Sequence, residues 1–184
     1  MDLKAQLASL VKKLSYQEGD FTLASGKKST FYVDLKNTTL HPAGADLIGR
    51  LAVKVLQDEG LHVDGVGGLT LGADPIATAV SLAAYQRDLV WPAFIVRKEP
   101  KDHGTGQYIE GAHNLIPGSK VVVLEDVVTT GGSSLKAIER LQEAGYQVAA
   151  VLTVVDREQG GAATFAAKDI PFFKLLTLNE VVKA

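Results

Sequence analysis

The sequence contains no cysteine among its 184 residues. This absence excludes disulfide bonds, thiolate nucleophiles and cysteine-ligated metals, and nothing indicates an oxidising compartment. A basic excess is also missing, because 19 lysines and arginines against 21 aspartates and glutamates give a formal net charge of -2. Broad electrostatic attraction to nucleic acid or to an acidic membrane is therefore not indicated.

Long apolar stretches are absent as well. No hydrophobic run approaches the ~20 residues that a membrane-spanning helix needs. The N-terminal residues 1–7 fit an amphipathic helix and lack the basic region and apolar stretch of a secretion signal. With 46% hydrophobic residues, the chain can bury the core of one domain, and we expect a soluble cytoplasmic protein.

The apolar pattern changes character at about residue 40. Before it, we expect a helix over residues 2–14 and a hairpin of two short strands, 21–23 and 31–35, that forms a hood. After it, helical patterns alternate with apolar segments that predict strands at 63–68, 94–96, 121–124, 148–155 and 171–176. We therefore expect a single α/β domain over residues 1–184, with an N-terminal helix and hood up to about residue 40. Its core, residues 41–184, should be a mostly parallel central sheet with helices on both faces.

The most informative stretch runs from Val121 to Ser134. Four apolar residues predict a strand buried on both faces, and Glu125 and Asp126 follow where that strand should end. A loop rich in hydroxyl groups and glycine then enters a helix, which suits an anion because the first N–H groups of a helix are free. Adjacent buried carboxylates are costly unless ribose hydroxyls or a hydrated metal satisfy them. The stretch predicts an anion site, with a plain strand-to-helix connection as the alternative.

Two other loops carry weaker signals. Gly65 to Thr70 approaches a dinucleotide fingerprint without its third glycine, so Gly67 and Gly68 suit either a tight turn or a second approach to an anion. The pair Asp74-Pro75 predicts a helix start with Asp74 as the N-cap. The sequence has no Walker A motif and no Gly-x-Ser-x-Gly elbow, which leaves little support for a P-loop nucleotide site or a hydrolase triad.

A basic segment breaks every periodicity between residues 97 and 113. Its cationic side chains suit a polyanion and a closing lid, although Glu99 and Asp102 offset part of the charge and a solvated surface segment is the alternative. Arg157 follows a core strand next to Asp156. It predicts either an ion pair with that neighbour or a planar guanidinium for a carboxylate ligand.

These segments together resemble a known family. Leu124 to Ser133, read as Leu-Glu-Asp-Val-Val-Thr-Thr-Gly-Gly-Ser, resembles the phosphoribosyl-pyrophosphate (PRPP) motif of type I phosphoribosyltransferases. Arg97 to Gly104 is similar to the mobile catalytic loop of the orotate phosphoribosyltransferase family, Phe21 to Ser29 to its N-terminal signature, and Asp156 to Gly161 to its orotate-contacting turn. The motifs follow the family's order over nearly the whole chain.

The resemblance implies a reaction. Orotate would take the ribose 5-phosphate group of PRPP, giving orotidine 5′-monophosphate and pyrophosphate in de novo pyrimidine biosynthesis. Mg²⁺ would be held mainly through PRPP and not directly by protein ligands. The family's homodimers share their active sites, so Lys98 or Lys101 would act in the neighbouring subunit. A purine phosphoribosyltransferase and a PRPP-sensing regulator that binds nucleic acid are the alternatives.

The resemblance also assigns roles to residues. Lys101 and Asp126 are the expected catalytic residues, and Thr129 and Arg157 the expected orotate contacts. The expected PRPP ligands are Arg97, Lys98, Lys101, His103, Glu125, Asp126, Val127, Val128, Thr129, Thr130, Gly131, Gly132 and Ser133. Some members carry lysines where this chain has Ala24 and the loop 69–72. Lys27, Lys28 or Lys36 are the candidates to supply that charge.

Overall fold

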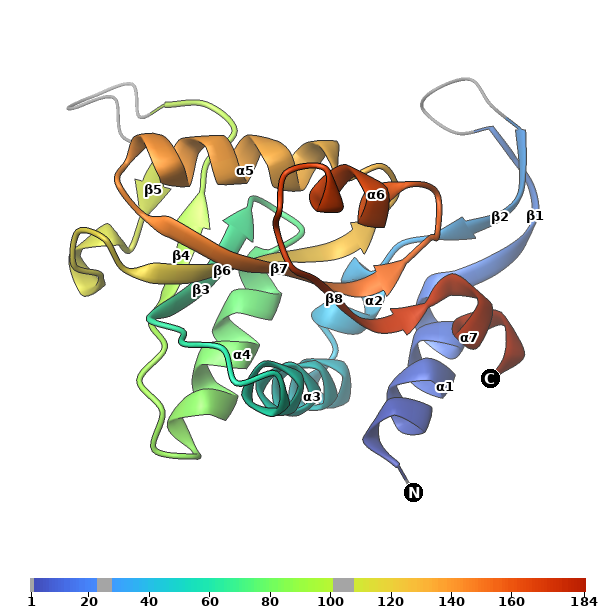
Figure 1. The fold of residues 1–184 in the computed structure, drawn as a ribbon. Coiled ribbons are helices and arrows are strands. Elements are labelled where there is room, and N and C mark those ends of the chain that lie inside the picture. The colour runs from blue at the N-terminus through green and yellow to red at the C-terminus, as the bar shows by residue number, and fades with distance from the viewer. Residues whose placement is uncertain (1, 23–27, 101–107) are drawn as a thin grey trace.

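The computed structural model describes residues 2–22, 28–100 and 108–184. Its centre is a six-stranded sheet with the order β5-β4-β3-β6-β7-β8 (Figure 1). Neighbouring strands are parallel except for the antiparallel pair β4–β5. The strands are β3 (Gly65–Leu69), β4 (Ala93–Val96), β5 (Ile109–Glu110), β6 (Lys120–Val128), β7 (Gln147–Asp156) and β8 (Phe172–Thr177).

Helices cover both faces of this sheet, as predicted (Figure 1). One face carries α1 (Leu3–Ser15), α3 (Pro42–Asp58), α4 (Asp74–Tyr85) and α7 (Leu178–Lys183), and the other carries α5 (Gly132–Glu143) and α6 (Gly161–Ala166). Three short elements that the periodicity did not reveal are α2 (Lys36–Thr39), β5 and the 3₁₀ turn η1 (Ala112–Asn114). No helix within the described residues is both long and apolar enough to span a bilayer.

The β6 strand shows why the sheet needs both layers. Val121 to Leu124 are all 0% exposed. Because successive side chains of a strand point to opposite faces, Val121 and Val123 join the core under α5, while Val122 and Leu124 join the core on the α3 and α4 side. The apolar run therefore sits between two cores, and β6 lies between β3 and β7.

The predicted hood is a separate antiparallel hairpin of β1 (Tyr16–Thr22) and β2 (Lys28–Val33). Both strands begin earlier than the sequence predicted, and the register shifts between Glu18 and Phe21. Aromatic pairs stiffen the hairpin, with ring centroids 5.9 Å apart for Tyr16 and Phe31. The hood stands beside the main sheet at its α1 end (Figure 1).

Two local predictions were wrong. The strand was expected to end before Glu125, but β6 continues to Val128, which pairs with Asp156 of β7. Asp74 was expected to be an N-cap, but Ala73 takes that position and Asp74 accepts a hydrogen bond from the Thr70 hydroxyl at 2.7 Å.

Gly67 and Gly68 lie inside β3, so neither forms the tight turn that was one of the two predictions for this segment. A Cβ on Gly67 would stand 2.1 Å from the Phe94 carbonyl oxygen, and one on Gly68 would stand 2.2 Å from that of Leu124. The neighbouring strands therefore leave no room for a side chain, which explains both glycines by packing.

Candidate active site

The loop between β6 and α5 forms a small cradle at the carboxyl end of the sheet. Gly131 takes the left-handed conformation at φ 88°, and α5 starts at Gly132 without a side-chain cap. The first four N–H groups of a helix have no acceptor within it, so this turn offers them to a ligand. The lining residues enclose about 200 Å³ and are Glu125, Val127, Val128, Thr129, Thr130, Gly131, Gly132, Ser133 and Ser134.

Helix α6 supports the cradle from behind. A Cβ on Gly131 would stand 2.8 Å from the Phe165 ring, and one on Gly161 would stand 2.2 Å from a Val128 methyl group. The Gly161 N–H donates to the Thr129 carbonyl at 3.1 Å. The loop is therefore held in shape by a fixed packing surface and does not depend on a ligand for its backbone path.

The two carboxyl groups have different surroundings. Glu125 is 7% exposed and accepts a hydrogen bond from the Ser134 hydroxyl at 3.1 Å. Burial raises the pKa of the Glu125 carboxyl from its ordinary 4.5 to about 8, and the charge of Asp126 adds to the shift. Asp126 is partly exposed and accepts from the Val127 N–H at 2.8 Å. Burial and the neighbouring charge therefore favour the protonated form of Glu125, and a ligand that donates a hydrogen bond would favour the ionised form.

Asp126 lies close to the β3–α4 loop and to a lysine. A Cβ on Gly72 would stand 2.8 Å from the Asp126 carboxylate, so the missing side chain leaves that carboxylate accessible. A hydrogen bond to Asp34 raises the pKa of Lys36, burial opposes that rise, and the charges of Asp34 and Asp126 add to it. Of the three lysines proposed to replace the family's missing charges, Lys36 has this link to Asp126. Lys27 lies outside the described residues, and Lys28 donates to the Thr22 hydroxyl at 2.9 Å.

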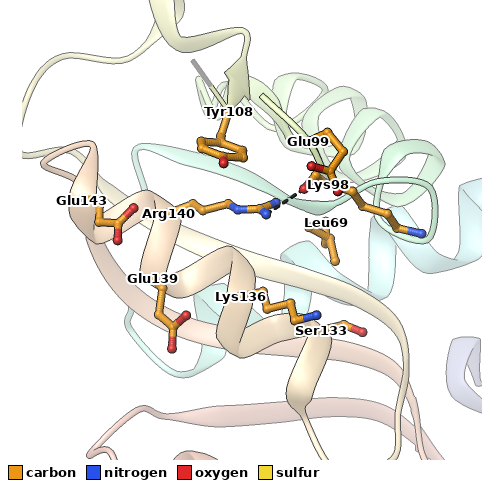
Figure 2. A pocket seen from close by; sticks show the side chains of 9 residues that line it. All are labelled: Leu69, Lys98, Glu99, Tyr108, Ser133, Lys136, Glu139, Arg140 and Glu143. Carbon is orange, nitrogen blue, oxygen red and sulfur yellow. Dashed lines mark hydrogen bonds between the residues drawn. The ribbon is translucent and has the colours of Figure 1, made fainter. Parts of the chain in front are cut away.

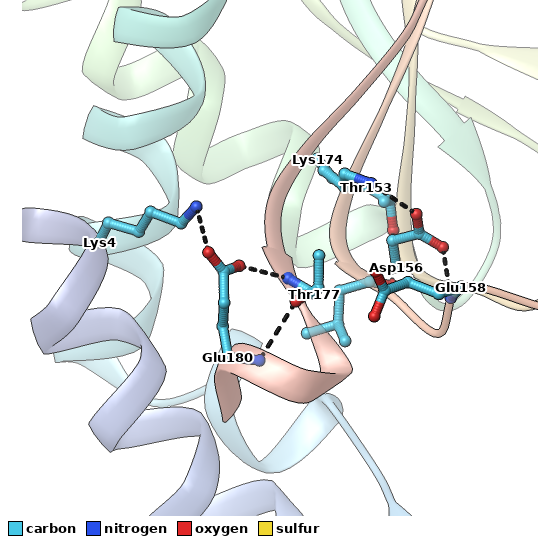
Figure 3. Close-up of polar contacts among 8 residues, drawn as sticks. Lys4, Thr153, Asp156, Glu158, Lys174, Thr177 and Glu180 are labelled. Carbon is cyan, nitrogen blue, oxygen red and sulfur yellow. Dashed lines mark hydrogen bonds and ion pairs between the residues drawn. The ribbon is translucent and has the colours of Figure 1, made fainter. Parts of the chain in front are cut away.

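Arg157 follows β7 beside the cradle, where its backbone N–H donates to the Val128 carbonyl at 2.9 Å, and it does not form an ion pair with Asp156. Asp156 instead bonds the Lys174 amine at 3.1 Å and the Glu158 N–H at 2.8 Å (Figure 3). The guanidinium carbon of Arg157 stands 5.3 Å from the centre of the Phe31 ring, and its buried Nε has no hydrogen-bond partner among the described residues. A buried donor without an acceptor is costly, so this N–H is available to a water or a ligand that accepts.

The described part of the basic segment leads away from β4. Arg97 donates to the Glu110 carboxylate at 3.1 Å and to the Glu99 carbonyl at 3.3 Å, so its charge is already paired. Lys98 is exposed. Lys101 and His103, two of the expected PRPP ligands, lie outside the residues that the structure describes.

A second hollow of about 620 Å³ lies between the basic segment and α5 (Figure 2). Sequence reasoning missed several of the residues that line it: Leu69, Tyr108, Lys136, Glu139, Arg140 and Glu143. Ser133 lines both hollows, so the two adjoin at the start of α5. Lys136 and Arg140 could have been found from the sequence as cations one and two turns into the helix that follows the anion loop.

The site therefore joins three chemical functions on one edge of the sheet. It has a turn of N–H groups, two carboxyl groups, and an arginine whose buried Nε has no hydrogen-bond partner among the described residues. Within the described residues, no cluster of three histidine, aspartate or glutamate side chains could hold a metal by itself.

Comparison with known proteins shows the family of the chain. Residues 35–172 match the model of the phosphoribosyl transferase domain family. An orotate phosphoribosyltransferase from a Nostoc species is 49% identical over 179 residues, which is 97% of this chain and 85% of the relative. A crystal structure of Mycobacterium tuberculosis orotate phosphoribosyltransferase with Fe(III) dicitrate has a TM-score of 0.87 at 42% identity, covering 98% and 99% of the two chains. The same enzyme in complex with PRPP has a TM-score of 0.83 at 39% identity, with coverage of 98% and 99%.

Proposed function

The chain belongs to the phosphoribosyltransferase family and, within it, to the orotate phosphoribosyltransferases, and we propose from this membership how its residues divide the reaction. The enzyme transfers the ribose 5-phosphate group of PRPP to orotate, with release of pyrophosphate, in de novo pyrimidine biosynthesis. The observation that carries the assignment of sites is the uncapped turn at Gly131 to Ser133 directly after Glu125 and Asp126.

In our proposal the cradle binds the 5-phosphate of PRPP. The backbone N–H groups of residues 129–133 donate to its oxygens, and the positive end of the α5 dipole favours its charge. Glu125 and Asp126 accept hydrogen bonds from the ribose hydroxyls. Because a hydroxyl donor favours the ionised carboxyl, PRPP binding at neutral pH should displace the proton that Glu125 holds.

The chemistry at the anomeric carbon needs no protein nucleophile. The bond to pyrophosphate weakens as positive charge grows on the sugar, and the orotate nitrogen forms the new bond. The protein contributes by positioning the two reactants and by placing cations where the leaving group gains negative charge. We assign that cationic role to Lys98, Lys101 and His103, with Lys101 as the main catalytic residue. Arg97 supports the segment through Glu110 and is a less direct participant than the sequence predicted.

Mg²⁺ fits the donors of this site as a partner of PRPP. Magnesium in proteins is commonly held by one or two carboxylates together with substrate phosphates, and Asp126 stands accessible beside Gly72. When bound, the ion would neutralise charge on the pyrophosphate. Lys36, which interacts with Asp126, would keep the carboxylate oriented toward the same region.

Arg157 and Thr129 are our proposed orotate contacts. The unpaired Nε of Arg157 suits the carboxylate of orotate, because a guanidinium can donate two parallel hydrogen bonds to a planar carboxylate. Thr129 is partly exposed at the start of the cradle, between the phosphate loop and the Arg157 turn. A base without the carboxylate would leave Arg157 unpaired, which supports selection of orotate over purines.

We further propose a cytoplasmic homodimer with shared active sites. Leu82 and Tyr85 lie three residues apart on α4 and are 61% and 73% exposed, which suits an apolar contact between copies. If Lys101 acts in the partner's site, mixing Lys101→Ala with Arg157→Ala should restore activity through hybrid dimers. Leu82→Glu should shift the sedimentation of the protein toward the monomer.

A base panel tests the proposed function against its alternatives. The protein is incubated with PRPP, Mg²⁺ and either orotate, hypoxanthine or adenine, and pyrophosphate release is measured. We expect release with orotate alone. Release with a purine but not with orotate would favour a purine phosphoribosyltransferase. Binding of RNA or DNA without any pyrophosphate release would favour a regulator that senses PRPP.

A further inference from the structure

Arg140 makes an unusual set of contacts outside the cradle. It projects from α5 across the larger hollow, toward Lys98 on one side and Tyr108 on the other (Figure 2). Its guanidinium donates to the carbonyl of Arg97 and, at 2.7 Å, to the carbonyl of Lys98. The same guanidinium lies 4.2 Å from the centre of the Tyr108 ring.

The choice of partners indicates a specific role. Glu99, Glu139 and Glu143 also line the hollow, but none of the ion pairs among the described residues involves Arg140. Strand β4 ends at Val96, so the carbonyls of Arg97 and Lys98 lie beyond its pairing with β3. Main-chain carbonyls at such a place need donors, and the planar fork of a guanidinium can serve two consecutive ones.

The two flanks of the segment also bond each other. The Arg97 N–H donates to the Tyr108 carbonyl at 2.8 Å, so the residues on either side of Arg140 form one unit. That unit rests on α5, whose first turn is the phosphate cradle. The amine of Lys98 and the hydroxyl of Ser133 lie toward the same end of the hollow, whereas Glu139 and Glu143 lie toward the other (Figure 2).

We propose that Arg140 is a positioning residue that fixes the backbone of Arg97 and Lys98 against α5 and thereby sets where the Lys98 amine stands. The expected effect of Arg140 on turnover rests on the proposed function. It does not depend on whether the Lys98 amine acts in its own subunit's site or in the partner's. Arg140 itself does not touch substrate; it acts through Lys98. Loss of the Arg140 side chain leaves the carbonyls of Arg97 and Lys98 without this donor, but water can reach them. The loss should therefore shift the Lys98 amine more than it lowers the stability of the fold.

The first arm of the test is kinetic. Arg140→Met keeps most of the side chain's length but removes its donors, and should lower kcat/KM for PRPP between about 10-fold and 100-fold, the range for a small misplacement of a reacting group. Arg140→Lys should fall between this variant and the wild type. Arg50→Met is the matched control, because Arg50 only forms an exposed ion pair with Asp46 on α3; its effect should be roughly twofold at most.

The second arm separates positioning from a general structural role. In a Lys98→Ala background, Arg140→Met should cause almost no further loss, because contacting residues that act through one group are not additive. Amide hydrogen exchange of the wild-type and Arg140→Met proteins should show faster exchange at Arg97 in the variant, with the thermal midpoint nearly unchanged.

Two results would overturn the proposal: a full additional loss in the Lys98→Ala background, or unchanged exchange at Arg97. If the wild type does not convert orotate at all, the proposed function fails instead, and the exchange experiment still decides whether Arg140 holds this backbone.

Discussion

The phosphate cradle and the groups around it are built in opposite ways. The cradle comes from one continuous stretch, the end of β6 and the first turn of α5, and its shape is fixed by backbone conformation and by Phe165. The remaining groups come from separate elements: Lys36 after the hood, Arg157 after β7, and the basic segment after β4. The cradle therefore acts through its backbone conformation, whereas the assembled part acts through single side chains that can be removed one at a time.

The largest effect should come from the assembled part. Lys101→Ala should lower kcat by about 100-fold to 1000-fold, the range for removing one preorganised donor to developing charge. PRPP affinity, measured by calorimetry, should change far less, because the lost interaction strengthens in the transition state. Unchanged turnover would remove Lys101 from the mechanism.

The next largest effect should come from the cradle. Gly131→Ala forces a side chain into a left-handed backbone position and against the Phe165 ring, so kcat/KM for PRPP should fall about 100-fold as the N–H groups move. Gly145→Ala is the matched control at the other end of α5, since Gly145 has φ +86° but no atom within 4 Å of an added Cβ. Both variants should lose stability in thermal unfolding, but only the first should lose PRPP binding. An equal kinetic loss in both would assign the effect to α5 as a whole.

A smaller and more selective effect is expected at Arg157. Arg157→Ala should raise the KM for orotate roughly 10-fold to 100-fold, as for the loss of a charge-assisted hydrogen bond, and should leave the KM for PRPP almost unchanged. Phe31→Leu should also raise the KM for orotate, but by less, because the Phe31 ring contacts the Arg157 guanidinium and not the orotate. A selective loss of PRPP affinity in the arginine variant would contradict its assignment.

The last effect concerns stability and not catalysis, and it depends on the proton on Glu125. Its pKa is about 8 in the folded protein against an ordinary 4.5, so the folded state binds more protons than the unfolded state between these values. Stability without ligand should therefore fall as pH rises from about 4.5 to about 8, and Glu125→Gln should flatten that slope. Urea denaturation of the wild type and of Glu125→Gln across this pH range measures the two slopes. A wild-type slope that the substitution leaves intact would place its source elsewhere.

The same contrast explains what the sequence could predict. The order of the main strands and helices and the two-layer cover follow from apolar periodicity, and the structure confirms them for the described part of the chain. The anion site at the cradle follows from local turn residues and stays a prediction. The continuation of β6 past Glu125 was missed because a carboxylate usually ends an apolar strand, and here the pairing with β7 overrides that preference. The packing role of Gly67 and Gly68 was missed because the carbonyl oxygens that leave no room for a side chain belong to neighbouring strands.

Contacts between distant residues lay beyond the sequence. The sequence left open whether Arg157 pairs with Asp156 or serves a ligand. In the structure Asp156 pairs with Lys174 of the adjacent strand, and the Arg157 guanidinium lies over the Phe31 ring of the hood. The contact of Arg140 with the Lys98 carbonyl joins residues 42 positions apart. No periodicity reports the cis peptide bond between Thr70 and Leu71.

The most direct measurement is the absorbance of orotate in the presence of the protein after PRPP and Mg²⁺ are added together. We predict a steady fall for the wild type, no fall when either PRPP or Mg²⁺ is omitted, and a much slower fall for Gly131→Ala. An orotate absorbance that stays constant with the folded wild-type protein, while the same protein consumes PRPP with adenine or hypoxanthine, would contradict the assignment of the site to orotate.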